Sequence, residues 1–528
     1  MNTVTRLLTR TRRLAGAAVC LALLATTPTP VAASPASADD LAAAERYLRD
    51  YMQRTRAPGL AYAVIRGDET LQHGAWGVDG DGRPMTVHTP FLLGSTSKSF
   101  TALAVTQLVE SGRVHLDTPV STYVPWLRLG AADTARTVTV RQLLTHTSGL
   151  PQVWSTDLTD RYDNRPGALT RSVRDLATVR PIAPAGQTYE YSDANYMILG
   201  ALVESVTGDT FGAHLRRHVL DPLRMTHSAA TADEARAIDI PAGHRYYLGR
   251  PQRFTAPFDT AGVPYGFLAA SLDDLSHYAA AQLGGGRFGD TRILSPQGTE
   301  QMHTGTVDTG HGTYGFGWKN STLDGVGTRI VWHAGATPDY FTHLVLVPDA
   351  NLAVIVMTNI YGLPMDAPLS AGAFNLARIL HGGTPATATA DPIHTWALGG
   401  LLTVAAALLA LLGWSVTRVR RHRTALPAHS RARTVVTTAC WIAGCAAVAA
   451  TATWLVPSFW KGAGLAKLQL WAPDVGHAIR TVVVLSAALA LTRIGISVYD
   501  TLRTHRPGAT TPPGAPARHT STQPSAPR

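Results

Sequence analysis

The most informative stretch of the 528-residue chain reads Phe91-Leu92-Leu93-Gly94-Ser95-Thr96-Ser97-Lys98-Ser99-Phe100-Thr101-Ala102-Leu103-Ala104. Ser95 and Lys98 are three residues apart, and positions i and i+3 lie on one face of a helix. If a helix begins near Ser95, the Lys98 amine can reach the Ser95 hydroxyl. A serine hydroxyl becomes a nucleophile when a neighbouring base takes its proton, so the pair is a candidate catalytic centre.

The scarcity of lysine supports this interpretation of Lys98. The four lysines are Lys98, Lys319, Lys461 and Lys467, and arginine supplies the rest of the 46 cationic residues. Buried lysine can lose its proton near neutral pH, whereas arginine cannot. A second S-x-x-K pattern ends at Lys461, but it follows an apolar stretch where Lys and Trp are ordinary interface residues. Taken in isolation, Ser95 and Lys98 could also be a helix cap and a surface charge.

The segments around the candidate centre predict an α+β domain. Its two chain ends are rich in strand patterns, and helices and loops fill the region from Ser95 to about Gln282. We therefore expect a sheet built from both chain ends with a helical region inserted between them. The expected elements are a helix over Leu41–Met52, strands over Gly59–Ile65, Thr70–Val78, Tyr314–Lys319, Arg329–His333, His343–Pro348 and Leu352–Thr358, and a closing helix over Ala367–Leu380.

Composition divides the chain into five segments. Hydrophobic residues make up 45% and charged residues 16%, which excludes a disordered protein. The net charge of +10 belongs to the flanks, so a nucleic-acid partner is not expected. We expect a signal peptide over 1–38, an extracytoplasmic domain over 39–385, a linker over 386–395, a membrane domain with three helices over 396–498 and a disordered cytoplasmic tail over 499–528.

The flanks also predict a topology. A basic start, a short apolar run and Ala36-Ser37-Ala38 predict an export signal with a cleavage site, and Ala32-Ala33-Ser34 is a rival cleavage site. Six arginines between residues 418 and 433 follow the first apolar span, and such loops stay in the cytoplasm. Both arguments place the domain outside, tethered to the membrane. The third span is the least regular, because Arg480 and Arg493 lie inside it and an intramembrane arginine is costly unless it is paired or reaches the interface.

Residues 91–104 resemble the nucleophile segment of the serine β-lactamase and penicillin-binding protein family. The similarity is greatest to the branch with class C β-lactamases, D-alanyl-D-alanine carboxypeptidases and esterases. It implies a β-lactamase/transpeptidase-like fold over about residues 40–382. Further segments that look like this branch are residues 140–151, Tyr191-Ser192-Asp193-Ala194-Asn195-Tyr196, Asp221-Pro222-Leu223-Arg224-Met225 and Tyr314-Gly315-Phe316-Gly317-Trp318.

The resemblance implies roles for particular residues. Ser95 would be the nucleophile, Lys98 and Tyr191 would transfer protons, and the backbone N–H groups of Ser95 and Ala336 would form the oxyanion hole. Two cations beside Tyr191 would lower its pKa. The family's Y-x-N element is here Tyr191-Ser192-Asp193, with a literal alternative at Tyr162-Asp163-Asn164.

The implied substrate-binding residues are Asp193, His333 and Gly335. His333-Ala334-Gly335 matches the family's third element better than His381-Gly382-Gly383, which follows a helix pattern and is more simply a cap. His333 would bind a carboxylate more strongly below its pKa. Ionised Asp193 only accepts hydrogen bonds, which disfavours acylamino substrates and leaves room for an ester or a free amine.

We therefore expect a membrane-anchored serine hydrolase that forms an acyl-enzyme. The three cysteines lie in apolar stretches, which excludes a disulfide framework and a thiolate zinc site, and we expect no metal and no cofactor. Candidate substrates are cell-wall D-amino-acid peptides or amides and small esters. Alternatives are a β-lactamase and a penicillin- or wall-fragment-binding receptor with little turnover. The expected partners are this substrate, the lipid bilayer and an unidentified membrane protein.

Overall fold

The computed structural model describes residues 37–130, 134–152, 158–421, 431–460 and 462–504, and the chain divides into two compact units, Met1–Asp391 and Pro392–Arg528. Almost all of the proposed signal peptide and most of the proposed tail lie outside the described residues. The two units are described separately below.

An eight-stranded sheet forms the centre of the first unit. Each strand in it pairs with its neighbours in the antiparallel direction. The strand order is β2-β1-β14-β13-β12-β11-β10-β9, so strands from both chain ends lie side by side, as the sequence predicts. The central strands β1, β13 and β14 are buried almost throughout, which agrees with their continuous apolar runs. The strands are β1 Gly59–Arg66, β2 Glu69–Gly77, β9 Val307–Asp308, β10 Thr313–Tyr314, β11 Lys319–Thr322, β12 Arg329–Ala336, β13 Phe341–Val347 and β14 Leu352–Thr358.

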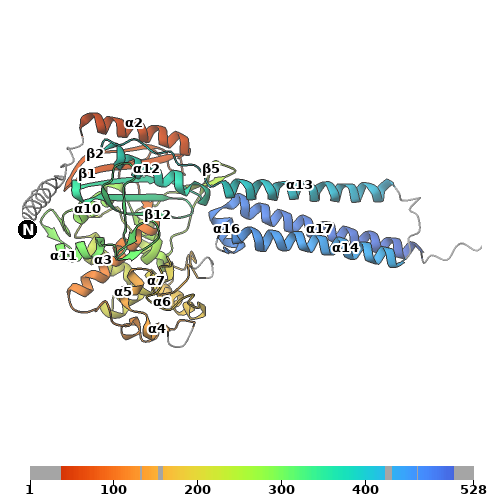
Figure 1. Ribbon diagram of the computed structural model, residues 1–528, viewed down its shortest axis with the longest axis horizontal. Coiled ribbons are helices and arrows are strands. Elements are labelled where there is room, and N and C mark those ends of the chain that lie inside the picture. Colours follow the sequence, from red (N-terminus) through yellow and green to blue (C-terminus); the bar gives the residue numbers. More distant parts are fainter. Residues whose placement is uncertain (1–36, 131–133, 153–157, 422–430, 461, 505–528) are drawn as a thin grey trace, which may run out of the picture. The chain divides into compact units, whose positions relative to one another are not determined.

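Helices cover the sheet, as Figure 1 shows. The terminal helices α2 (Ala38–Thr55) and α12 (Asp366–Ile379) pack against each other, and α12 also packs on β13 and β14. Helix α10 (Leu272–Leu283) packs on β1 and β14. The inserted region holds α3 Ser97–Glu110, α4 Thr134–Thr137, α5 Val140–Leu144, α6 Ala168–Asp175, α7 Asp193–Thr207, α8 Phe211–Leu215 and α9 Ala232–Ala237, and α11 Pro296–His303 follows α10.

Two parts of the first unit differ from the sequence expectation. The strand predicted over Tyr314–Lys319 is instead the end of β10, a turn and the start of β11. Gly317 adopts a φ of 75° in this turn, and a Cβ there would lie 2.8 Å from Ser99 Cα, so the chain turns to contact α3. The region expected to be helical also contains a hairpin, β4 (Gly243–Tyr247) and β5 (Arg250–Phe254).

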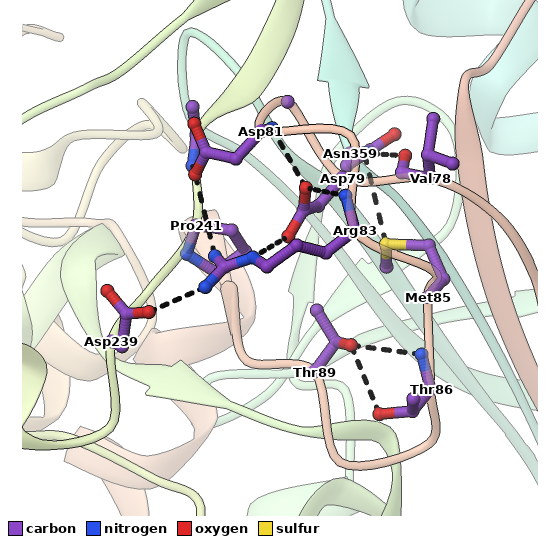
Figure 2. A network of polar contacts seen from close by, with 12 residues as sticks. Val78, Asp79, Asp81, Arg83, Met85, Thr86, Thr89, Asp239, Pro241 and Asn359 are labelled. Carbon is purple, nitrogen blue, oxygen red and sulfur yellow. Dashed lines mark hydrogen bonds and ion pairs between the residues drawn. The ribbon is translucent and has the colours of Figure 1, made fainter.

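A network of polar contacts fixes the turn that follows β2 (Figure 2). The guanidinium of Arg83 lies 2.8 Å from the carboxylate of Asp79 and 2.6 Å from that of Asp239. The side chain of Asn359, next to the end of β14, donates to the carbonyl of Val78 at 2.8 Å. The network therefore joins residues from the beginning, middle and end of the domain.

The second unit consists of long apolar helices. Three segments are long and apolar enough to cross a membrane, namely Pro392–Arg420, Arg431–Ser458 and Pro473–Leu502. The first helix begins inside the expected linker, and the third continues to Thr504, so residues 499–504 are helical rather than part of a disordered tail. The helices are α13 Pro392–Arg421, α14 Arg431–Ala450, α15 Val456–Ser458, α16 Leu465–Trp471 and α17 Pro473–Thr504.

Candidate active site

Ser95 and Lys98 meet at the start of α3. Ser95 lies in the 3-10 turn η1 (Gly94–Thr96), which leads directly into α3, rather than in the first turn of the α-helix itself. The Lys98 side chain has no exposed surface. Its amine lies 3.1 Å from Ser95 Oγ, and it also donates to Asp193 Oδ1 at 2.6 Å and to the carbonyl of Tyr265 at 2.9 Å. The predicted nucleophile and base are therefore within hydrogen-bond distance.

Burial changes the acid–base properties of Lys98. It disfavours the charged ammonium form and so lowers the pKa of Lys98, while the charge and hydrogen bond of Asp193 oppose this effect. Because burial has the larger effect, the amine loses its proton more readily than an exposed lysine would. This is the property expected of a lysine retained among arginines.

Asp193 is the first residue of α7, and protein groups occupy both of its carboxylate oxygens. Oδ1 accepts from Lys98 Nζ, and Oδ2 accepts from Gln152 Nε2 at 2.8 Å. Gln152 also accepts from the Asp193 backbone N–H at 2.9 Å. We expected Asp193 to face the substrate, but its carboxylate is held between Lys98 and Gln152. Gln152 had not been singled out, because nothing in its sequence context indicates a partner 41 residues away.

Tyr191 lies beside this pair, between two amines. Lys98 Nζ is 4.8 Å and Lys319 Nζ is 5.8 Å from the centre of its ring. Burial nevertheless raises the pKa of Tyr191 well above its ordinary value, the charge of Asp193 adds to this, and a hydrogen bond with Ser95 opposes it. The expectation that neighbouring cations lower the pKa of Tyr191 is therefore wrong, because burial disfavours the charged phenolate, and Tyr191 is a neutral phenol near pH 7.

His146 packs against Tyr191 and holds the backbone next to it. It is fully buried, its ring centre lies 4.4 Å from that of Tyr191, and its Nδ1 accepts from the Ser192 backbone N–H at 3.1 Å. Burial lowers the pKa of His146 well below its ordinary value, so the ring is uncharged near neutral pH. These contacts fix the segment that carries Tyr191.

Strand β12 forms the other wall of the site. β11 pairs with Arg329–Trp332 only, and the rest of β12 packs against η1. A Cβ at Gly335 would lie 2.6 Å from the backbone nitrogen of Ser95, and a Cβ at Gly94 would lie 2.1 Å from that of Ala336. Glycine at both positions therefore lets the backbones of η1 and β12 come into contact. This contact brings the predicted oxyanion donors, the N–H groups of Ser95 and Ala336, close together.

His333 lies within β12 rather than at its end, and its ring is engaged inside the protein. Nδ1 donates to the carbonyl of Ala334 at 2.7 Å, and Nε2 lies 3.2 Å from the hydroxyl of Tyr314, which donates to it. Burial lowers the pKa of His333 well below its ordinary value, and the charges of Lys319 and Lys98 lower it further. His333 is therefore neutral near pH 7, and the stronger carboxylate binding expected below its pKa would require a pH well below neutral.

Lys319 is the residue of this site that sequence analysis missed. It is half-buried on β11, directly opposite Trp332, and its amine lies 4.7 Å from the centre of the Trp332 ring. Burial lowers the pKa of Lys319, the charge of Lys98 adds to this, and Asp366 opposes it. Within the described residues its amine has no hydrogen bond and no ion pair. The rarity of lysine in the chain is the sequence signal that could have found it.

The alternative motif positions have local structural roles. Asp163 is paired with Arg165 and Arg171, and Asn164 donates to the carbonyl of Phe258. Gly382, after His381, adopts a φ of 70° just beyond the end of α12, as expected for a helix cap.

The fold and the site together define the class of protein. An antiparallel sheet with an inserted helical region carries a serine and a lysine at a helix start, a tyrosine opposite them and a glycine-containing strand at the side. The Beta-lactamase family model matches residues 44–378, and the chain belongs to this family.

Individual relatives agree with this assignment. Penicillin-binding protein 4 of Amycolatopsis lactamdurans is 33% identical over 316 residues, which are 57% of this chain and 81% of the relative. Protein flp of Staphylococcus aureus strain N315 is 23% identical over 320 residues, or 60% of this chain, and the chain spans only 62% of that relative's length. The octameric penicillin-binding protein homologue from Pyrococcus abyssi aligns with a TM-score of 0.57 at 25% identity, covering 68% of this chain and 81% of that one.

Proposed function

We propose that this chain is a serine hydrolase that works through an acyl-enzyme formed on Ser95. The observation that carries the proposal is the 3.1 Å contact between Lys98 Nζ and Ser95 Oγ, made by an amine with no exposed surface. A general base must lie within hydrogen-bond reach of the proton that it takes, and this contact meets that requirement.

Acylation follows from the hydrogen bonds of Lys98. In its neutral form the amine keeps two N–H bonds, which Asp193 and the carbonyl of Tyr265 accept. The lone pair then faces the Ser95 hydroxyl and takes its proton as Oγ bonds to the carbonyl carbon of the substrate. The backbone N–H groups of Ser95 and Ala336 stabilise the resulting oxyanion, with about 3 kcal/mol expected for each donor.

Tyr191 completes the proton transfer. As a neutral phenol it donates its proton to the leaving group, and the Lys98 ammonium returns a proton to Tyr191. The carbon–leaving-group bond breaks and Ser95 keeps the acyl group. Water then attacks the ester, its proton passes to the same pair of residues, and Ser95 recovers its hydrogen, so that the enzyme returns to its starting state.

Lys319 favours substrates that carry a negative charge. Of the cationic groups near Ser95, Lys98 is occupied by the protein and His333 is neutral, whereas the Lys319 amine has no ion pair among the described residues. A carboxylate placed against Tyr191 and Trp332 would meet this amine. Cell-wall peptides ending in D-alanine have such a carboxylate beside the scissile amide, so we place them ahead of D-amino-acid amides and small neutral esters.

Two other functions use the same serine. A β-lactam also has a carboxylate and would acylate Ser95, so β-lactam hydrolysis is the nearest alternative. A penicillin- or wall-fragment receptor would form the same adduct but release it slowly. The rate of deacylation therefore separates an enzyme from a receptor.

We also propose that the three C-terminal helices anchor the domain on the outer side of a membrane. Their length and hydropathy support anchoring, and the arginines near residues 418–433 support a cytoplasmic loop between the first two. An extracytoplasmic site would have direct access to the cell wall.

Active-site labelling tests the hydrolase proposal. The full chain would be treated with a fluorophosphonate or a fluorescent penicillin, and peptide mapping would locate the adduct. We expect the label on Ser95, its loss in Ser95→Ala, and turnover of a D-alanyl peptide, an ester or a cephalosporin at measurable rates. An adduct on another residue would overturn the site assignment, and a stable adduct without turnover would favour the receptor.

A further inference from the structure

The three long helices of the second unit enclose a cavity of about 290 Å³ near one end. The end of α13, the beginning of α14 and the last third of α17 contribute to it. One arginine from each helix lines the cavity, namely Arg418, Arg433 and Arg493. Asp500 is the one carboxylate among the lining residues, so arginines outnumber acids at this place.

Arg493 is the residue that most requires an explanation. It lies inside the third candidate membrane span, Pro473–Leu502, where an unpaired arginine is costly. Its guanidinium lies 5.0 Å from the ring centre of Trp414 and 3.9 Å from that of Trp441. Its Nε and Nη2 are inaccessible to solvent and have no hydrogen-bond acceptor within the described part of the chain. Two donor nitrogens of this side chain are therefore held in place without a hydrogen-bond partner among the described residues.

A second arginine increases the positive charge at the same place. Arg418 lies 5.3 Å from the ring centre of Trp414, so this indole contacts the guanidinium groups of both Arg418 and Arg493. Neither arginine forms an ion pair with a carboxylate among the residues that the structure describes. Two like charges held near one ring repel each other. An anion between them would reduce this repulsion and accept hydrogen bonds from the donors that have no partner.

The remaining lining fits a phosphate attached to a hydrocarbon chain. Thr434, Thr438 and Ser497 supply hydroxyl groups that can donate to phosphate oxygens, whereas Val419 and Ile496 form apolar wall. Basic pockets between helix ends at a membrane surface are suited to anionic lipid headgroups, since the acyl chains remain in the bilayer.

We propose that this cavity binds the phosphate headgroup of an anionic phospholipid, with Arg493 and Arg418 as its principal donors. The lipid phosphate adds negative charge beside Arg493 and Arg418, neither of which is paired with a carboxylate among the described residues, and it gives the buried nitrogens of Arg493 hydrogen-bond acceptors. The site depends on the helices lying in a membrane and is independent of the proposed hydrolase chemistry at Ser95.

Native mass spectrometry of the full chain in detergent tests the proposal. Phosphatidylglycerol, phosphatidylcholine and inorganic phosphate would be titrated separately into wild type, Arg493→Gln and the control Arg480→Gln. Arg480 lies on the same helix and is exposed, and it does not line the cavity. We expect saturable binding of phosphatidylglycerol, at least roughly tenfold weaker in Arg493→Gln, and unchanged in Arg480→Gln; tenfold is about 1.4 kcal/mol.

Other outcomes would contradict it. Equal binding of phosphatidylglycerol and phosphatidylcholine, or equal binding by wild type and Arg493→Gln, would overturn the site. Displacement of the lipid by inorganic phosphate at equal concentration would identify free phosphate as the ligand and contradict the proposal that the cavity binds a lipid. If Arg493→Gln does not fold, Arg418→Gln at the end of α13 replaces it, with labelling of Ser95 as the check that the first unit is intact.

Discussion

Replacing Asp193 by Asn tests the charge that the structure places beside Lys98. The two side chains are 2.6 Å apart, and Lys98 is without exposed surface while Asp193 is 15% exposed. Asn has nearly the same shape but no charge. We expect the pKa of Lys98 to fall, because the carboxylate stabilises the ammonium and its removal leaves burial, which already lowers this pKa, without its main opposing effect.

The size of the effect follows from the contact. Unit charges 4 Å apart interact by about 4 kcal/mol at an effective dielectric constant of ~20. Neighbouring opposite charges shift pKa values in proteins by about 1–3 units, and one unit is about 1.4 kcal/mol. The rising limb of kcat/KM against pH reports the essential base of the free enzyme. It should therefore move to lower pH by about 1–3 units.

The assay is a pH profile of ester hydrolysis for wild type, Asp193→Asn and Gln152→Ala. Gln152→Ala is the matched control, because it removes the other contact of the carboxylate and leaves its charge. The rate of fluorophosphonate labelling of Ser95 against pH gives a second profile if turnover is slow. A limb that stays in place, or moves to higher pH, in a folded Asp193→Asn variant would refute the reasoning.

Three further predictions concern binding, backbone packing and stability. Lys319→Met should raise KM for a carboxylate-bearing ester at least tenfold, since a hydrogen bond to a charged group contributes about 1.5–3 kcal/mol, and should leave KM for its neutral methyl ester unchanged; equal effects on both would contradict the role. Gly335→Ala should push η1 and β12 apart, because its Cβ would lie 2.0 Å from the Leu93 carbonyl oxygen. Labelling of Ser95 should then slow by roughly 10²-fold, as it does when an oxyanion donor is lost. A wild-type labelling rate would contradict the proposed contact between these two backbones. Burial raises the pKa of Asp339 to about 7, so the folded state binds a proton that the unfolded state releases near pH 4, and stability should fall as pH rises between these values. Thermal melts of Asp339→Asn should show a flatter dependence in this window, and a slope like that of wild type would count against it.

Local patterns were sufficient for much of the architecture. Gly59–Ile65 and Leu352–Thr358 were predicted as strands, and they pair with each other in the sheet. The turn at Gly317 was missed; the backbone there packs closely against α3, a contact that residue spacing does not reveal. The three apolar spans were found because twenty or so apolar residues are a sufficient signal on their own.

The sequence by itself determined that Ser95 and Lys98 are neighbours, because residues three apart share a helix face whatever the rest of the chain does. It also determined which segments are apolar enough to lie in a membrane. Only the tertiary structure decided that Asp193, 95 residues away, holds the Lys98 amine, that His333 is neutral and Lys319 faces Tyr191, and that Arg493 meets Trp414 and Trp441. The physical reason is that charge and pKa depend on burial and on distant partners, and neither is encoded in the spacing of residues along the chain.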